Sequence, residues 1–447
     1  MIRNRLGNMS VIVRLVVSLV GPPLVVLGAL LLVTSSTGAQ SASKYGLSAI
    51  HFSGLQRYTP EQSIAASGLH VGSSIELSDL QSAAERLSKT GAFDTVSFRY
   101  STRGNELTAE FGVTETKDVL PCIFDNFVWF SDAELSHTLR QHVTFYNGEA
   151  PVRGETVGKI RGALQDLLRA NGISGEVSEI PYGSVGKQLL GLLFRVDGIS
   201  QPIKNIEFSG EAAVSKKQLS DASATLRNQD FSVTNAASYA SAALLPLYYQ
   251  RGYLRSQFGR ADVKLIDATS KGAVSEVSIT LPVEEGNQYL WDGATWSGNQ
   301  VLSVADLAKI FGMNPPEVAN QEKIDAGFAN VRKAYQSRGY IKVSIDPKRE
   351  LNDSTKLASY TVQVEEGKQF HMGQVYFEGL PERAESGLLK KWKLKPGDVY
   401  DASYLPDFLT NTAGKELVQQ GVTIHTTAIK LESDEGSLTV NLHIQFH

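Results

Sequence analysis

Adjacent glutamates occur twice in this sequence, at Glu284-Glu285 and at Glu365-Glu366. Two carboxyl groups held close together can divide general acid and general base work, so each pair is a candidate catalytic site. Both pairs end an apolar, strand-like stretch, and neighbouring residues on a strand point to opposite faces. Neither pair would then converge on one substrate. We interpret both pairs as a solvated structural edge of the fold.

The other residues that could do chemistry lack partners at a useful spacing. His137 and His142 do not have the spacing of the His-Glu-x-x-His zinc motif. The single cysteine, Cys122, excludes an intramolecular disulfide and is interpreted as a buried structural thiol. The sequence contains no Gly-x-Ser-x-Gly elbow and no phosphate-binding loop. It therefore predicts no catalytic residue, metal site or cofactor. An envelope hydrolase, the enzyme alternative, would need a convergent polar pocket.

Charge and the N-terminus bound the function further. A formal net charge of −4 gives no support to a nucleic-acid-binding surface. Arginines precede the apolar run 15–33, and small residues up to Ala39 follow it, which is the order of a cleaved secretory signal over residues 1–39. The run is also close to the ~20 residues of a membrane span, so an uncleaved anchor is the alternative. In both cases residues 40 onward are exported.

The elements that position these residues repeat along the chain. Five glycines, each after a helix-like stretch, are spaced by roughly 80 residues, which indicates a tandem array. They are Gly91, Gly172, Gly252, Gly339 and Gly421. A second glycine follows the first strand of most repeats in an aromatic-x-Gly pattern, at Gly54, Gly210, Gly298 and Gly379. In the second repeat we place this strand at 127–131, with Ser131 where glycine is expected.

One repeat shows the local order of elements. Thr59-Pro60 with Gln62 predicts a capped helix start, and Ser78 with Gln81 predicts a second. Behind the second cap, Leu80, Ala83, Ala84 and Leu87 share one helical face. Two alternating strands follow, on either side of the turn at 103–105. The fold class is therefore α+β, with five β-α-α-β-β units. Each is expected to be a three-stranded sheet covered on one face by two helices, in an elongated array.

The aromatic residues beside the first strands have two interpretations. They could be platforms for a ligand, but their position favours core residues under the helices. These aromatics are Phe52, Phe208, Trp296 and Phe377.

Together these landmarks resemble a known family. The unit order, the aromatic-x-Gly, the Gly-aromatic after the second helix (Gly252-Tyr253, Gly339-Tyr340) and the terminal Val-Glu-Glu-Gly are similar to polypeptide-transport-associated (POTRA) domains. Such domains form the periplasmic arms of outer-membrane assembly and secretion proteins. Members usually carry a C-terminal barrel. Since only 437–447 follows Gly436, we expect the arm without the barrel.

The resemblance divides the chain into five units. The expected boundaries are 46–116, 117–200 (divergent), 201–286, 287–367 and 368–447. The implied partners are outer-membrane or secreted polypeptides and a separate barrel assembly protein. The implied location is the periplasm at the outer membrane, or the inner membrane facing the periplasm if the leader is an anchor.

Exposed sheet edges are where an extended client could add a strand. The candidate edges are the first and last units, at Val96, Phe98 and Tyr100 and at Val422, Ile424 and Thr426. The expected function is a non-enzymatic scaffold that binds extended polypeptides by β-augmentation. The alternative is a structural adaptor that docks one envelope protein and touches no client chains.

Overall fold

The computed structural model describes residues 10–11, 44–183 and 189–447. There the chain has a mixed α+β fold with several sheets, which confirms the predicted class. The predicted leader lies outside the described residues except for Ser10 and Val11. The fold divides into two compact units. Of the described residues, the first contains those up to Glu207, Thr225–Ala236 and Ala261–Thr280, and the second contains Phe208–Ala224, Ala237–Arg260 and Leu281–His447.

The first sheet has the strand order β1-β4-β5-β2-β3. Its strands are β1 (Ser10–Val11), β2 (Tyr45–Ser53), β3 (Ser74–Ile75), β4 (Phe93–Arg103) and β5 (Glu106–Glu115). The central strand β5 is parallel to β2 and antiparallel to β4. Alternate residues of β5 from Leu107 to Glu115 are buried. That face of the sheet is covered by helices, as in other sheets with one packed face.

The helices of this sheet are α1 (Pro60–Ser67) and α2 (Leu77–Lys89). The cap predicted at Thr59 is confirmed: its side chain accepts the N–H of Gln62, and Gln62 accepts the N–H of Thr59. The cap predicted at Ser78 is wrong. Helix α2 starts two residues earlier, with Glu76 as its N-cap, because the Asp79 carboxylate accepts the N–H of Glu76 at 2.8 Å.

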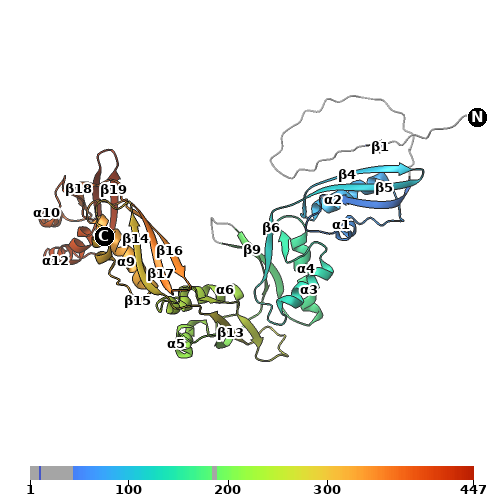
Figure 1. Cartoon of the computed structure of the whole chain (residues 1–447), viewed down its shortest axis with the longest axis horizontal. Coiled ribbons are helices and arrows are strands. Elements are labelled where there is room, and N and C mark those ends of the chain that lie inside the picture. The colour runs from blue at the N-terminus through green and yellow to red at the C-terminus, as the bar shows by residue number, and fades with distance from the viewer. Residues whose placement is uncertain (1–9, 12–43, 184–188) are drawn as a thin grey trace, which may run out of the picture. The chain divides into compact units, whose positions relative to one another are not determined.

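The second sheet has the order β7-β6-β9-β8 and carries helices on one side (Figure 1). Its elements are β6 (Val119–Phe124), α3 (Asp132–His142), β7 (Glu149–Pro151), α4 (Thr156–Ala170), β8 (Glu176–Gly183) and β9 (Leu189–Asp197). The first strand predicted at 127–131 is wrong. Ser131 is the N-cap of α3, in a capping box with Glu134, so the aromatic run before it forms a turn rather than a strand.

The boundary between the two compact units runs through the third sheet. Its elements are β10 (Ile203–Ser209), α5 (Lys216–Ala222), α6 (Val233–Tyr239), a π-helical turn (Ala240–Leu244), α7 (Leu245–Tyr249), β11 (Gln257–Phe258), β12 (Asp262–Leu265) and β13 (Val277–Glu284). A short 3-10 turn (Ala224–Leu226) follows α5. The π-helical turn lies directly before α7, which has Pro246 in its first turn.

The fourth and fifth sheets lie in the second compact unit. The fourth, in the order β15-β14-β17-β16, contains β14 (Leu290–Ser297), α8 (Val304–Phe311), β15 (Glu317–Val318), α9 (Gln321–Gln336), β16 (Ser344–Asn352) and β17 (Leu357–Glu365). The fifth, in the order β18-β20-β19, contains β18 (His371–Glu378), α10 (Glu382–Lys391), α11 (Tyr404–Phe408), a π-helical turn (Leu409–Ala413), α12 (Gly414–Gln419), β19 (Thr427–Asp434) and β20 (Thr439–Phe446).

The number of strands per sheet departs from the prediction. Three strands are found only in the fifth sheet, whereas the others have four or five. In the first, second and fourth sheets the extra strands β3, β7 and β15 come from the segment between the two helices, which pairs with the first strand. A short run of two or three residues before the second helix gives no alternating pattern.

Separate hydrophobic cores lie between the sheet and the helices in the first, second, fourth and fifth sheets. The first is centred on Leu80, Leu87 and Phe111, and the fourth on Trp291, Phe328 and Tyr335. Further clusters belong to the second and fifth sheets. The aromatics Phe208, Trp296 and Phe377 are buried and Phe52 is partly buried against Phe111, which supports the core interpretation of these residues.

Candidate polypeptide-binding edges

The strand at the antiparallel edge of each sheet is the candidate site. In the second, fourth and fifth sheets this strand is β8, β16 and β19, and in the first sheet it is β4, whose outer side is paired only with the two-residue β1; each is antiparallel to the central strand. The opposite edge is covered by β3, β7 or β15 in three of these sheets. The outward backbone N–H and C=O groups of an edge strand can pair with an extended chain.

On β4, the three predicted residues do not share one environment. Val96 is buried toward the helices, whereas Phe98 and Tyr100 are partly exposed. The outer edge of β4 is paired with a short segment of the same chain, with Tyr100 opposite Val11 and Ser101 opposite Ser10 in antiparallel register. The edge of β4 therefore has a geometry that accepts an added antiparallel strand.

In the fifth sheet the predicted residues lie just before the edge strand. Helix α12 ends at Gln419, and the Val422 N–H still donates to Leu417 O at 2.9 Å. Val422 and Ile424 pack against the core instead of forming the edge. Thr426 exchanges two backbone hydrogen bonds with His447, and β19 begins at the next residue. The three candidate residues thus lie just before the edge strand, which is Thr427–Asp434.

All eight residues of β19 are exposed. Ile429 lies opposite Ile444 and Leu431 lies opposite Leu442, and these partners on β20 are fully buried. Cross-strand partners project from the same face of a sheet, so Ile429 and Leu431 belong to the helix-covered face. They are nevertheless 51% and 45% exposed, because the helices do not extend over this strand. An added strand would find apolar contacts there as well as backbone partners.

The glutamate pairs have a structural role that the sequence did not reveal. In the fourth sheet, the Glu366 carboxylate accepts the N–H groups of Gln300 and Val301 at 2.7 and 2.8 Å, and the Tyr335 hydroxyl at 3.0 Å. Glu365 beside it is exposed. The second glutamate of the pair therefore fastens the loop after the first strand, and only the first is fully solvated.

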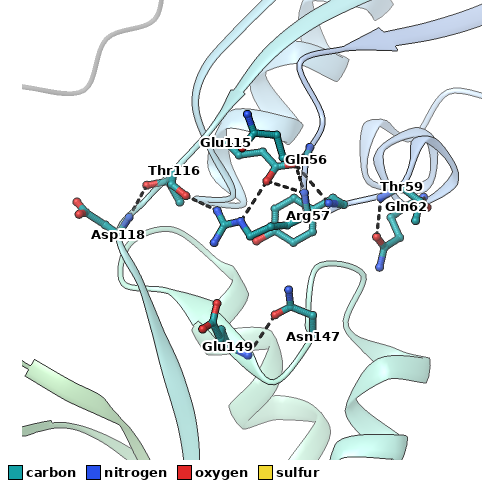
Figure 2. A network of polar contacts seen from close by, with 10 residues as sticks. Gln56, Arg57, Thr59, Gln62, Glu115, Thr116, Asp118, Asn147 and Glu149 are labelled. Carbon is teal, nitrogen blue, oxygen red and sulfur yellow. Dashed lines mark hydrogen bonds and ion pairs between the residues drawn. The ribbon is translucent and has the colours of Figure 1, made fainter.

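The same arrangement recurs in two other sheets. Glu285 accepts the N–H groups of Ala212 and Ala213 at 2.7 and 2.9 Å. In the first sheet Glu115 accepts the N–H groups of Gln56 and Arg57 at 2.7 and 3.0 Å, and Arg57 Nε at 3.1 Å, as Figure 2 shows. We call Glu115, Glu285 and Glu366 the clamp glutamates.

The glycine before each clamped loop belongs to the same device. Gly54, Gly210 and Gly298 have φ of 90°, 84° and 79°, a conformation that favours glycine. A Cβ on any of them would collide with the carbonyl oxygen of the residue two before the clamp glutamate, Val113, Val283 or Val364. The glycine of the aromatic-x-Gly pattern therefore packs directly against the valine two residues before the clamp glutamate. This contact explains why the two patterns recur together.

The periodic glycines after the second helix join successive sheets. In the second compact unit, Tyr289 N–H donates to Gly252 O and Phe370 N–H donates to Gly339 O, both at 2.8 Å. A Cβ on Gly339 would lie 2.5 Å from Phe370 O. Each glycine therefore ends its helix, as predicted, and also receives the segment that starts the next sheet.

Side chains reinforce both joints in the same way. Gln288 Nε2 donates to Arg251 O at 2.9 Å, and Gln369 Nε2 donates to Arg338 O at 3.0 Å. A basic residue three positions after the glycine then reaches an acidic residue in the next hairpin. These pairs are Arg255 with Asp353 and Lys342 with Glu435. The duplicated contacts fix each edge strand relative to the preceding sheet.

Buried ionisable groups have shifted pKa values with structural causes. Burial of Glu115, whose side chain is 4% exposed, acts to raise its pKa. The N–H groups of Gln56, Arg57 and Tyr58 and the Arg57 guanidinium outweigh that effect, so the pKa of Glu115 lies below its ordinary value. Burial and the hydrogen bond to Glu366 raise the pKa of Tyr335, which keeps the phenol protonated as a donor.

The candidate chemical groups do not assemble into a reactive site. Burial, with the Glu149 charge, raises the pKa of Cys122 to about 12, so its thiol is unreactive at neutral pH. His137 Nε2 lies 2.9 Å from Gln141 Nε2. Within residues 10–11, 44–183 and 189–447, no group of three or more His, Cys, Asp or Glu side chains is placed to hold a metal ion. In the same ranges, no helix has both the length and the apolar character of a membrane span.

Comparisons with known proteins match one of the repeats to a family model. The family model described as POTRA, surface antigen variable number repeat, matches residues 290–367. A Treponema pallidum (strain Nichols) protein, provisionally assigned as an outer membrane protein assembly factor, is 27% identical over 219 residues, covering 48% of this chain and 26% of that protein. The outer membrane protein assembly factor BamA of Buchnera aphidicola is 20% identical over 396 residues, covering 85% of this chain and 60% of that protein.

A solved structure is also similar. The POTRA3-5 structure of BamA from Haemophilus influenzae covers 55% of this chain and 96% of its own length, with 20% identity and a TM-score of 0.41. At that TM-score the superposition alone establishes no shared fold. The chain spans less than two thirds of the length of the curated relatives described above. Residues 290–367 thus match the POTRA family model, and the chain is similar to outer membrane protein assembly factors.

Proposed function

We propose that the chain is a non-enzymatic periplasmic scaffold that binds extended polypeptides by β-augmentation during outer-membrane protein assembly or secretion. In this proposal, five POTRA units with the boundaries given above follow one another. The names of the curated relatives, which are outer membrane protein assembly factors, support this role. The clients would be outer-membrane or secreted polypeptides, and a separate barrel assembly protein would be a further partner.

The observation that carries the proposal is the open edge of β19. Eight consecutive residues pair with β20 on one side and are exposed on the other. Backbone hydrogen bonds recognise an extended chain with little regard to its sequence. Each contributes only about 0.5–1.5 kcal/mol net, so a single edge would bind weakly. Weak binding suits a scaffold that must also release its clients.

The clamp glutamates and the glycine joints support the scaffold role. Both are repeated contacts between backbone groups and a few side chains. In the second compact unit, the glycine joints hold successive sheets together, and with them the edges of the fourth and fifth sheets. Several weak sites along one chain raise each other's effective concentration for one long client.

The test is a titration of the exported chain with an extended peptide, followed by backbone NMR of selectively labelled residues on β4 and β19. We expect shifts confined to edge-strand amides at millimolar peptide, in a sequence-tolerant manner. Unshifted edge amides at that concentration would refute strand addition.

A second candidate is a structural adaptor that docks one envelope protein. It is favoured by the open face of the fifth sheet, where Tyr376, 43% exposed, stacks on His443 with ring centroids 4.5 Å apart. Glu378 Oε1 lies 2.9 Å from Nδ1 of the same histidine. An exposed aromatic among polar groups is typical of protein interfaces. A pull-down from envelope extract separates the two: one stoichiometric partner favours the adaptor, and many clients favour the scaffold.

A further inference from the structure

We propose that strand addition is confined to the edges of the first and fifth sheets, β4 and β19, and that the edges of the three sheets between them are closed to it. This inference rests on the proposed function and specifies which edges perform it. It follows from differences among the edge strands that the repeat pattern alone conceals.

Proline interrupts two of the middle edges. Pro347 lies inside β16 and Pro181 lies inside β8, and both are exposed. The pairing of β16 with β17 continues on both sides of Pro347, through nine consecutive residues. Proline is tolerated in a sheet where its missing N–H would face away from the neighbouring strand. Each ring therefore occupies the outward side, where it removes a donor and obstructs an added strand.

The third sheet closes its edge in another way. Its outer strand is split into β11 and β12, of two and four residues. Gly259, Arg260 and Ala261 separate them, and Gly259 N–H donates to Pro282 O at 2.8 Å. Very short and interrupted edge strands are a common protection against unwanted pairing. No continuous ladder can form along this edge.

The two outer edges have neither feature. From Thr95 to Arg103, β4 pairs with β5 without a register shift, and it contains no proline. Its outer side already carries Ser10–Val11 as an antiparallel strand. Likewise, β19 contains no proline or glycine and keeps one register over eight residues. An uninterrupted row of outward backbone groups is what an extended client needs.

The outward positions of β19 can be assigned. Thr426 and His447 exchange both of their backbone hydrogen bonds, so Thr426 faces β20. Backbone groups alternate in direction along a strand, and the register continues without a shift. The N–H groups of Ile429 and Leu431 therefore point outward. The occupant is an extended polypeptide with apolar side chains at alternate positions, since these would contact the half-exposed Ile429 and Leu431.

The experiment uses the full chain with a photo-crosslinking amino acid at one edge position at a time. The positions are Thr102 on β4, Glu179 on β8, Lys348 on β16 and Lys430 on β19. The probe is a short peptide of alternating valine and threonine. We expect crosslinks from β4 and β19 and none above background from β8 and β16. Equal labelling of β8 or β16 would overturn this inference and leave the proposed function intact, whereas no labelling at any edge would overturn both.

Two variants test the cause. Ile429→Pro removes an outward N–H without removing a bond to β20, and we expect labelling at β19 to fall by about tenfold. Ile429→Thr is the matched control, since it shortens the same side chain but keeps the N–H. Conversely, Pro347→Thr should open β16 and create labelling there. If Pro347→Thr, shown to be folded by circular dichroism, gains no labelling, proline is not what closes this edge and the inference fails.

Discussion

Removal of the Glu366 carboxylate is expected to free the loop that it clamps. The Glu366→Ala variant would leave the N–H groups of Gln300 and Val301 without their acceptor and Tyr335 without its hydroxyl partner. Hydrogen bonds to a charged acceptor contribute about 1.5–3 kcal/mol each, so the two backbone bonds sum to about 3–6 kcal/mol. Glu366 is only half-buried, and water can replace part of this. We expect a local loss of about 3 kcal/mol.

Hydrogen exchange measured by mass spectrometry reports this loss at the loop itself. About 3 kcal/mol corresponds to roughly a hundredfold faster exchange of the two amides. Glu365→Ala is the matched control, because Glu365 is the adjacent and exposed glutamate. Its exchange should match that of the parent chain. If both variants exchange alike, or if only Glu365→Ala accelerates the loop, the assignment of the clamp to Glu366 is wrong.

Three further outcomes follow from other positions. Gly339→Ala should destabilise its sheet by at least ~2 kcal/mol more than Gly421→Ala. Both glycines have positive φ, but only at Gly339 would a Cβ collide with Phe370 O. Urea unfolding of the two variants measures the difference in free energy of unfolding. Since the pKa of Glu115 is lowered in the folded chain, its contribution to stability is present above the ordinary carboxyl pKa and is lost as pH falls through the folded value. Glu115→Gln should flatten the acid limb of a stability–pH curve, and an unchanged limb would contradict this. Cys122, with a pKa of about 12, should be alkylated in the folded chain roughly a thousandfold more slowly than in urea; equal rates would show that the thiol is accessible.

Much of the fold could be predicted because its signals are local. The capping box at Thr59 and the buried face from Leu80 to Leu87 depend on residues within two helical turns of one another. Strands β4 and β5 show the alternation of a sheet with one covered face. The same locality explains the error at 127–131, where an aromatic run resembles a strand. The capping box of Ser131 with Glu134 competes for that segment and starts a helix instead.

The candidate edge in the fifth sheet could not be placed as accurately. Residues 422–426 continue the alternation of a strand, so the sequence does not show where pairing begins. That boundary is set by a long-range partner, since Thr426 meets His447 across the sheet. The roles of Glu285 and Glu366 were missed for the same reason: their donors lie more than sixty residues earlier in the chain. Only an alignment of the repeats could have indicated these roles, because it places the paired glutamates and the glycine after the first strand at equivalent positions.

Under the proposed function, different parts of each repeat stabilise the array and bind the client. The clamp glutamates hold the loop after the first strand, and the joint glycines hold the start of the next sheet, so both devices act on the parallel side and the ends of each unit. The outward backbone groups of the antiparallel edge strand take part in neither, since the ion pairs at the joints reach only the hairpin that follows this strand. The sequence of the edge strand can therefore vary without loss of the array. Pro347 removes no hydrogen bond between β16 and β17, and β19 keeps its pairing with β20 over its whole length. Selection on client binding can then open or close each edge independently of stability. Accordingly, the stability of Pro347→Thr should stay within about 0.5 kcal/mol of the parent chain even as its binding changes.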